Sequence, residues 1–205
     1  MSDSEHIAKL IALASEDETL QEAQHAAARK ELRAVDLVYP RDACAITQSC
    51  LLQAAGIDVA DTYGALALGL AMEKRGWQRI VVGKQQPGDL GSTCKSEPDH
   101  GNDHIYLVLR TLNDDEMVVA DNQSSRPHFR YASGKGGKTP TTHFLRAVNV
   151  MDTAQNKMST AQAAIKAAAL PGKPTAPTAS ESALRRILDI LQELVADAQK
   201  IGGPL

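Results

Sequence analysis

The segment HIYLVLRTLNDDEMVVADNQ, residues 104–123, constrains the fold of this chain more than any other. Two runs rich in large apolar side chains, residues 104–111 and 116–123, flank the polar sequence LNDD. Runs of this kind separated by a short polar connection are typical of a β-hairpin. The segment therefore predicts two adjacent antiparallel strands near the middle of the chain.

Helical patterns precede this hairpin. Residues 5–34 repeat apolar side chains at steps of three and four, which predicts one or two packing helices. Pro40 ends that run, and the following ACAITQSCLLQAAGI predicts a helix that Asp42 caps and that ends near Gly56. TYGALALGLAMEKRG predicts another helix, ended by Gly76. Helices followed by strands indicate an α+β fold.

Shorter strands are expected on both sides of the hairpin. WQRIVVG predicts a strand, QQPGDLGS contains a Pro-Gly turn, and HFLRAVNV predicts one more strand after the loop YASGKGGKTP. We therefore expect three regions, which are an N-terminal helical region (1–37), a domain with the hairpin (38–150) and a C-terminal extension (151–205).

The C-terminal extension differs in composition from the rest. AQAAIKAAAL predicts an alanine-rich helix, and the proline-rich residues 170–179 predict a linker. The final segment places apolar side chains at alternating steps of three and four, among them Leu184, Ile187, Leu191 and Leu194. Such a stripe favours a helix that either folds back on its own domain or mediates self-association or docking on a partner.

Charge and hydropathy exclude several partners. The chain has 22 basic and 25 acidic residues, a net charge of −3, so no strong field favours nucleic acid or an anionic membrane surface. The first thirty residues carry acids where a signal peptide needs a basic start. No segment has the roughly 20 apolar residues of a membrane span. We expect a protein made in the cytoplasm without a signal peptide.

Three cysteines in such a chain do not predict a disulfide framework, so each is considered by itself. Cys44 falls in the first turn of a predicted helix, where unpaired N–H groups and the helix dipole favour a thiolate. Cys50, six residues on, points to another face and lies beside Leu51 and Leu52, which predicts a core residue. Cys44 is the candidate nucleophile, and a catalytic Cys44 is expected to react with iodoacetamide well below pH 8.

A base for Cys44 is available at the start of the hairpin. His104 opens the first strand, and a polar group on the adjacent strand would fix its tautomer. Asp121 and Gln123 share one face of that strand if it continues to its end, whereas Asn122 points the other way. Asp121 is the preferred orienting residue, with Gln123 and Asn122 as possible orienting or oxyanion-binding residues.

Other histidines and the third cysteine are weaker candidates. His100, four residues before His104, is a rival base on a loop. Cys94 lies near both histidines, but four well-spaced metal ligands do not occur, so no metal site is expected. The remaining histidines are expected to be solvated or at strand edges, with His128 near the hairpin exit as a residue that borders the cleft; they are His6, His25, His128 and His143.

In their order, DACAITQSCLLQAAGI, QPGDL, HIYLVL and VVADNQ resemble the CHAP and NlpC-type cysteine amidases, papain-like peptidoglycan hydrolases. In that superfamily a cysteine starts the core helix, a PGD turn leads into the sheet, and a histidine starts the next strand. A polar residue lies on the strand after it, and Asp121 with Gln123 looks most like the CHAP branch. The match covers roughly residues 38–150 and departs from the pattern at the polar stretch KSEPDHGND.

The resemblance implies a papain-like fold with N-terminal helices packed on an antiparallel sheet and a C-terminal helical extension. It implies a cofactor-free hydrolase that cleaves an amide in the peptide part of bacterial peptidoglycan, through the Cys44 thiolate and a thioacyl-enzyme. A cell-wall substrate without an export signal suggests a phage endolysin or an effector of contractile, type VI secretion that acts in the periplasm. A cognate immunity or delivery protein is then an expected partner.

Two other functions stay open. The same fold serves a cysteine peptidase or acyltransferase that acts on a cytoplasmic substrate and needs no export. A non-enzymatic virion or assembly protein with a degenerate hydrolase fold, bound to a partner through its C-terminal helix, is the other. The reactivity of the Cys44 thiol distinguishes an enzyme from a non-enzymatic protein.

Overall fold

The computed structural model describes residues 2–99 and 101–148, which belong to one compact unit, Met1–Val148. The predicted helical region 1–37 and nearly all of the predicted domain 38–150 thus lie in the same unit. The predicted linker 170–179 and the apolar stripe of the C-terminal helix lie outside the described residues.

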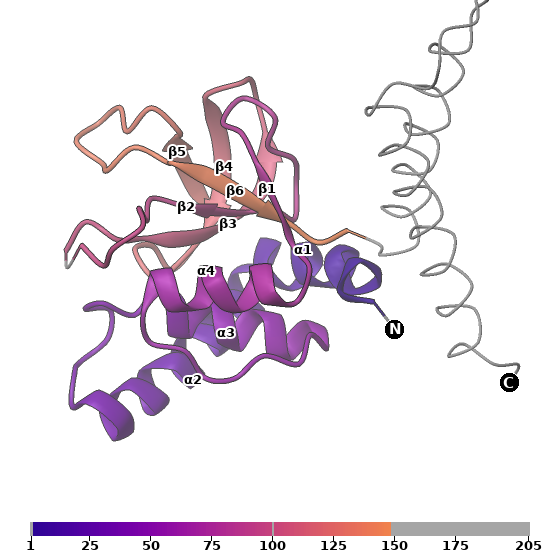
Figure 1. The fold of residues 1–205 in the computed structure, drawn as a ribbon. Helices are drawn as coiled ribbons and strands as arrows, with labels where there is room; N and C mark the ends of the chain where they lie inside the picture. Colours follow the sequence, from indigo (N-terminus) through magenta and orange to yellow (C-terminus); the bar gives the residue numbers. More distant parts are fainter. Residues whose placement is uncertain (1, 100, 149–205) are drawn as a thin grey trace, which may run out of the picture. The chain divides into compact units, whose positions relative to one another are not determined.

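The described residues form an α+β fold, as the sequence predicts (Figure 1). After a 3₁₀ turn, Asp3–His6, the helices are α1 (Ile7–Ser15), α2 (Asp17–Val35), α3 (Cys44–Ala55) and α4 (Ala65–Lys74). The strands are β1 (Gln78–Ile80), β2 (Leu90–Ser92), β3 (Ile105–Thr111), β4 (Glu116–Ala120), β5 (His128–Tyr131) and β6 (His143–Arg146). They form one antiparallel sheet in the order β1-β6-β2-β3-β4-β5. None of the described helices is long and apolar enough to cross a membrane.

The predicted hairpin is confirmed as β3 and β4, joined by residues 112–115. A bulge interrupts their register between Val108 and Arg110. Strand β4 ends at Ala120, three residues before its expected end, so Asp121 and the two residues after it leave the sheet. This early end changes the directions of the side chains that form the candidate site.

Two strands were not foreseen. Strand β2, Leu90–Ser92, pairs with both β3 and β6 at the centre of the sheet although it has three residues, one of them glycine. Strand β5, His128–Tyr131, pairs with β4. Both are too short for hydrophobic periodicity to be recognised in the sequence, and their pairing with neighbouring strands of the sheet defines them.

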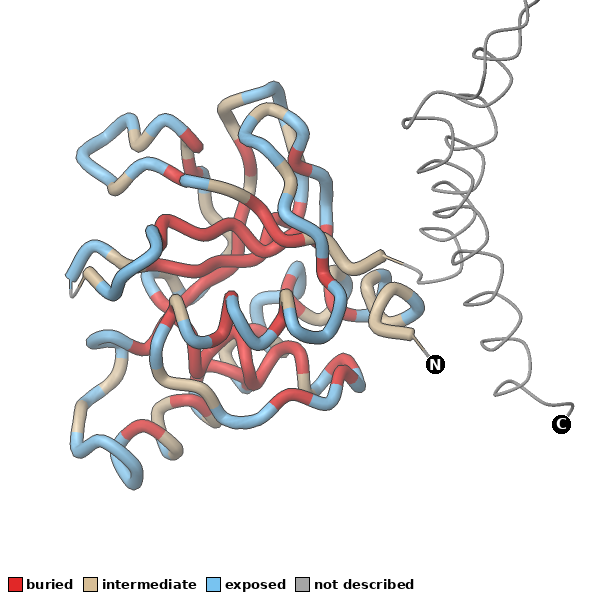
Figure 2. The backbone as a smooth tube through the Cα atoms, in the orientation of Figure 1, coloured by how far each residue is buried: buried red, intermediate tan, exposed pale blue. Residues whose placement is uncertain are grey.

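Helix α3 lies at the centre of the helical layer and is buried almost along its whole length (Figure 2). It ends as predicted, because Gly56 adopts a left-handed conformation with φ +102° and the Ile57 N–H donates to the Leu52 carbonyl at 2.9 Å. Its start differs from the prediction: Ala43, not Asp42, is the N-cap, and no side chain caps the helix. Asp42 instead has a positive φ of 51° in the tight turn before the helix.

The two faces of the sheet carry separate apolar clusters. Ile105 and Leu107 on β3 belong to the main core with the helices, whereas Tyr106 and Val108 pack with Phe144 on the opposite face. Tyr106 crosses the facing Gly91, where an added Cβ would lie 2.2 Å from the Tyr106 Cζ. Gly91 is therefore the residue that gives the Tyr106 ring its place beneath the candidate site.

Candidate active site

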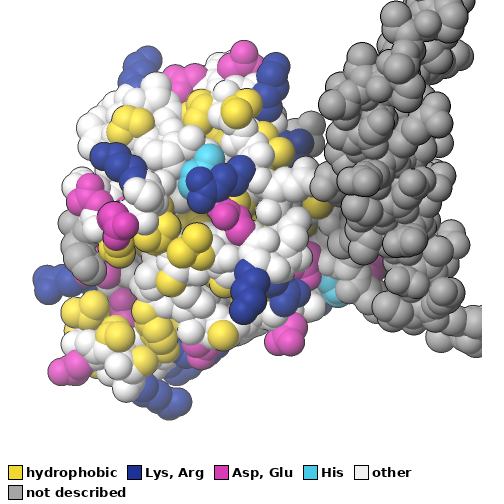
Figure 3. Space-filling view, viewed as in Figure 1, with side chains coloured by type: hydrophobic (Ala, Val, Ile, Leu, Met, Phe, Trp, Pro, Cys, Tyr) yellow, Lys and Arg dark blue, Asp and Glu magenta, His cyan; other side chains and the backbone are white. Residues whose placement is uncertain are grey.

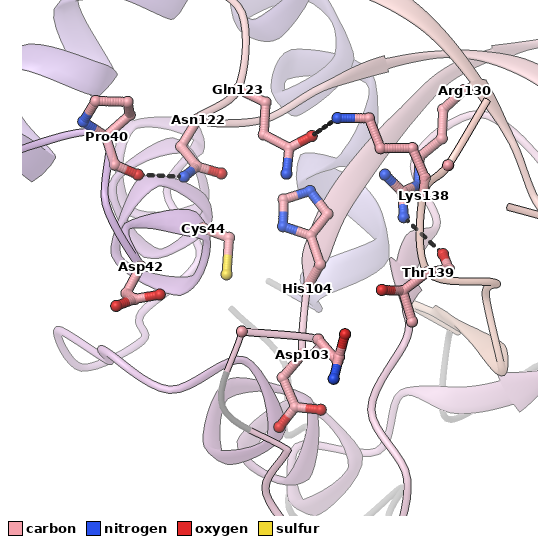
Figure 4. Close-up of a pocket in the computed structure, with 13 residues that line it drawn as sticks. Pro40, Asp42, Cys44, Asp103, His104, Asn122, Gln123, Arg130, Lys138 and Thr139 are labelled. Carbon is pink, nitrogen blue, oxygen red and sulfur yellow. Dashed lines mark hydrogen bonds between the residues drawn. The ribbon is translucent and has the colours of Figure 1, made fainter.

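Cys44 opens into a pocket of about 350 Å³ at the edge of the sheet (Figure 4). Thirteen residues line it: Pro40, Asp42, Cys44, Gly101, Asn102, Asp103, His104, Asn122, Gln123, Arg130, Gly137, Lys138 and Thr139. The turn before α3, the start of β3, the end of β4 and the loop after β5 thus meet at one place. The pocket brings together Cys44 and His104, the nucleophile and the base predicted from the sequence.

Helix α3 holds Cys44 at its first residue, with its side chain 5% exposed. In the first intrahelical hydrogen bond, the Thr47 N–H donates to the Ala43 carbonyl at 3.0 Å. The N–H groups of the first turn, including that of Cys44, therefore have no carbonyl partner within the helix. A helix start of this kind directs N–H donors and partial positive charge toward the pocket.

Burial nevertheless outweighs the helix start in setting the charge of Cys44. Loss of solvent raises the pKa of the Cys44 thiol to about 11, although the backbone N–H groups of Ile105 and Ala45 oppose the increase. The nearby Asp121 carboxylate adds to it. The sequence-based expectation that the helix start favours a thiolate at Cys44 is therefore not met, because burial favours the neutral thiol.

His104 is held in place from three sides. Its backbone N–H donates to Thr93 Oγ1 at 2.7 Å, and its carbonyl accepts from the Thr93 N–H at 3.0 Å. Its ring stacks against Tyr106, with centroids 6.0 Å apart and planes at 27°. Its Nε2 lies 2.8 Å from Asp121 Oδ2. This contact leaves Nδ1 as the nitrogen free to exchange a proton, and one ring nitrogen faces the Cys44 side in Figure 4.

Asp121 lies behind His104 and is fully buried. Burial alone would raise its pKa, but hydrogen bonds from His104 and from His128, whose Nε2 is 3.0 Å from Oδ1, hold the pKa well below its usual value. The Gln123 N–H also donates to Oδ1, at 2.7 Å. Asp121 is therefore a fixed carboxylate that orients His104, as the sequence places it.

His128 is the residue that sequence reasoning placed too loosely. It was expected at a strand edge or near the cleft, yet it is the second imidazole on Asp121. Its Asp121 contact raises the pKa of His128, against a smaller opposing effect of burial. The register that pairs His128 with Val119 across β4 and β5 brings it there, and nothing in the local sequence announces that register.

Asn122 and Gln123 both line the pocket, contrary to the expected alternation. The prediction assumed that β4 continues through them, whereas it ends at Ala120. Asn122 Nδ2 donates to the Pro40 carbonyl at 2.8 Å and so ties the end of β4 to the turn before α3. Gln123 Oε1 accepts from Lys138 Nζ at 2.9 Å, and Figure 4 places its amide group beside the His104 ring.

Cys94 and His100 are the two sequence candidates that remain. Cys94 is buried next to β2, its N–H donating to Ser92 Oγ at 3.2 Å, and it does not line the pocket. His100, the rival base, lies outside the described residues. Within residues 2–99 and 101–148 no group of three or more metal-binding side chains occurs.

The face of the described unit that Figure 3 shows has no dominant charge. Figure 3 displays basic and acidic side chains interspersed over the face in view. Comparison with known proteins adds no assignment, because no protein-family model, no curated protein and no solved structure matches the chain. Function must therefore be argued from the geometry of the pocket.

Proposed function

We propose that this chain is a papain-like cysteine amidase of the CHAP and NlpC type, with Cys44 as nucleophile, His104 as general base and Asp121 as orienting carboxylate. One observation carries the proposal. Cys44 starts the central helix in the same pocket as His104, and the far nitrogen of His104 is held at 2.8 Å by a fully buried carboxylate. A nucleophile, a base and an orienting residue are the parts that this chemistry requires.

The topology supports the papain-like assignment. A helix that starts with the candidate nucleophile packs on an antiparallel sheet, the base directly precedes β3, and the orienting residue directly follows the adjacent strand β4. These are the relations that the resemblance to CHAP and NlpC enzymes implies. The order of the segments along the chain agrees with it as well.

The chemistry begins from a thiol because burial keeps Cys44 protonated. As Sγ attacks the amide carbonyl, its proton passes to Nδ1 of His104, and the carbonyl π electrons move to oxygen. The resulting imidazolium is stabilised by Asp121. The C–N bond then breaks, the His104 proton goes to the leaving amine, and water hydrolyses the thioacyl-enzyme with His104 again accepting a proton.

We assign the stabilisation of the oxyanion to two donors. The Cys44 N–H at the helix start is one. The side-chain amide of Gln123 is the other, because its oxygen is bound to Lys138 and its nitrogen remains to donate. Asn122 is less suited, since its nitrogen already donates to the Pro40 carbonyl.

The proposed substrate is an amide in the peptide part of bacterial peptidoglycan. Delivery by a phage or by a contractile secretion system would bring the protein to the periplasm, with a cognate immunity or delivery protein as partner. The alternative of a non-enzymatic protein with a degenerate hydrolase fold has one observation in its favour, the raised pKa of Cys44. An activity assay separates the two.

Purified full-length protein should release soluble fragments from peptidoglycan sacculi, and Cys44→Ala should reduce that release at least about a thousandfold. The matched control is Cys50→Ala, which removes a second buried sulfur from the same helix. Release by Cys50→Ala should stay within a few-fold of the unmodified protein once folding is verified by circular dichroism. Equal release by the Cys44→Ala variant would refute the nucleophile assignment.

A further inference from the structure

Arg130 is a buried cation in the wall of the active-site pocket. Arg130 is 3% exposed, and it reaches the pocket from β5. Its Nη2 donates to the Thr139 carbonyl at 3.1 Å, whereas its buried Nε has no hydrogen-bond partner. No carboxylate among the described residues forms an ion pair with it.

The surroundings of Arg130 compensate its charge only in part. The guanidinium lies 4.5 Å from the centroid of the Tyr106 ring, a cation–π contact. A guanidinium does not lose its proton in a protein, so burial leaves it charged. Buried charges in folded proteins are normally paired. An unpaired one that borders a solvent-accessible pocket indicates a ligand group of opposite charge.

Lys138 is a second cation on the same side of the pocket as Arg130. Lys138 comes from the glycine-rich loop after β5, and its Nζ is held by Gln123 at 2.9 Å. The loop is tightly closed at Gly134, where φ is +78° and an added Cβ would lie 2.4 Å from the Lys138 carbonyl oxygen. In Figure 4 Arg130 and Lys138 lie on the far side of the His104 ring from Cys44 and Asp42.

We propose that Arg130 and Lys138 bind a carboxylate of the substrate that lies close to the scissile amide. The guanidinium offers the forked donors that match a carboxylate, and Lys138 adds a second charge. That such a substrate is cleaved rests on the proposed function, whereas binding of the carboxylate does not. For a peptidoglycan stem peptide, the site selects the form whose D-glutamate carboxylate is free over the form in which it is amidated.

Binding is measured with the full chain carrying Cys44→Ala, so that no turnover occurs. The probes are two synthetic stem tetrapeptides that differ in one group, the D-glutamate α-carboxylate or its carboxamide, titrated by calorimetry. The acid should bind about 10- to 100-fold more tightly than the amide. Arg130→Gln should remove this preference, and Arg130→Lys should retain part of it.

Control variants test whether charge anywhere nearby suffices. Lys138→Gln should reduce the acid preference, whereas Lys135→Gln, in the same loop but outside the pocket, should leave it unchanged. Arg126→Gln, whose arginine pairs with Asp17 at 3.1 Å, should also leave it unchanged. Thermal unfolding of each variant reports folding separately from selectivity.

The outcomes separate this inference from the proposed function. Equal affinity for acid and amide, or no measurable binding of either peptide, overturns the carboxylate site. A lower Tm of Arg130→Gln with an unchanged acid preference also overturns it, because the role is then structural. Acid-selective binding by the Cys44→Ala protein, with no fragment release from sacculi by the unmodified chain, supports the site and refutes the amidase.

Discussion

Cys44 and Cys50 lie six residues apart on the same helix and are almost equally buried, at 5% and 6% exposure. Burial raises the pKa of both thiols. Nearby charges would favour a thiolate at Cys50, because Lys30 lowers the pKa of Cys50 more than Asp61 raises it, whereas Asp121 raises the pKa of Cys44. Neither burial nor the charge of the neighbours therefore identifies the nucleophile.

The difference between the two cysteines lies in proton transfer. Cys44 shares its pocket with a histidine that a buried carboxylate orients. Cys50 also borders a hollow, but that hollow is lined by helices α1, α2 and α3 and contains no histidine. Lys30 there is engaged with Gln53 and Asp61 at 2.9 and 2.5 Å. A buried thiol becomes a nucleophile where a base can take its proton, and this favours Cys44 as the proposed nucleophile.

The largest effect is therefore expected from the base. His104→Ala should reduce fragment release from sacculi by about 10²- to 10⁴-fold, because Cys44 would then resemble Cys50 in having no oriented histidine beside it. The control is His143→Ala, on β6, whose Nδ1 contacts Thr142 Oγ1 at 2.8 Å away from the pocket. Full activity of His104→Ala would show that the comparison rests on the wrong histidine.

The pH profile of alkylation sharpens the comparison next. With its pKa raised to about 11, Cys44 should react with iodoacetamide about tenfold faster for each pH unit between 7 and 10, because its thiolate fraction rises by that factor. The profile of Cys50 should reach its midpoint at lower pH, since Lys30 opposes the effect of burial there. Peptide mass spectrometry resolves the two sites. A Cys44 midpoint below pH 8 would indicate a resting thiolate and contradict the general-base mechanism.

The sequence predicts much of this comparison because its parts are local. Helix-breaking residues and apolar periodicity within a few positions predict Cys44 at a helix start, Cys50 in the core and His104 at the beginning of a strand. Asp121 follows from strand adjacency in a hairpin with a four-residue connection. Each of these inferences needs the conformation of one element or of two neighbouring ones.

What the sequence does not predict depends on distant parts of the chain. The pKa of Cys44 is set by burial, which every packed element contributes to. His128 and Arg130 reach the site through β5, a four-residue strand with no period of its own. Lys138 comes from a loop whose path depends on three positive-φ glycines, at positions 134, 136 and 137. Asn122 turns into the pocket because β4 ends early.

A smaller effect is expected from changing the packing that supports the His104 ring. Cys50 has no corresponding supported histidine. Gly91→Ala would place a Cβ 2.2 Å from the Tyr106 Cζ and displace the ring that stacks on His104. We expect a loss of about 1–3 kcal/mol in the free energy of unfolding, measured by urea denaturation, with reduced activity. Gly69→Ala is the control, since its Cβ would lie 3.7 Å from Leu145 Cδ1, an ordinary contact. Equal stability of the two variants would mean that Tyr106 moves freely.

The smallest effect concerns His128, which shares Asp121 with His104. Its pKa is raised by the Asp121 hydrogen bond, so its charged form stabilises the fold below the unfolded value of 6.5, and this contribution is lost as pH rises through the raised folded value. His128→Gln should therefore destabilise the protein by on the order of 1 kcal/mol at pH 5.5 and by less at pH 9. Urea denaturation at the two pH values measures this. A destabilisation that grows with pH would mean that Asp121 does not hold a proton on His128. His104 would then be the only histidine charged through Asp121, and it alone would distinguish the surroundings of Cys44 from those of Cys50.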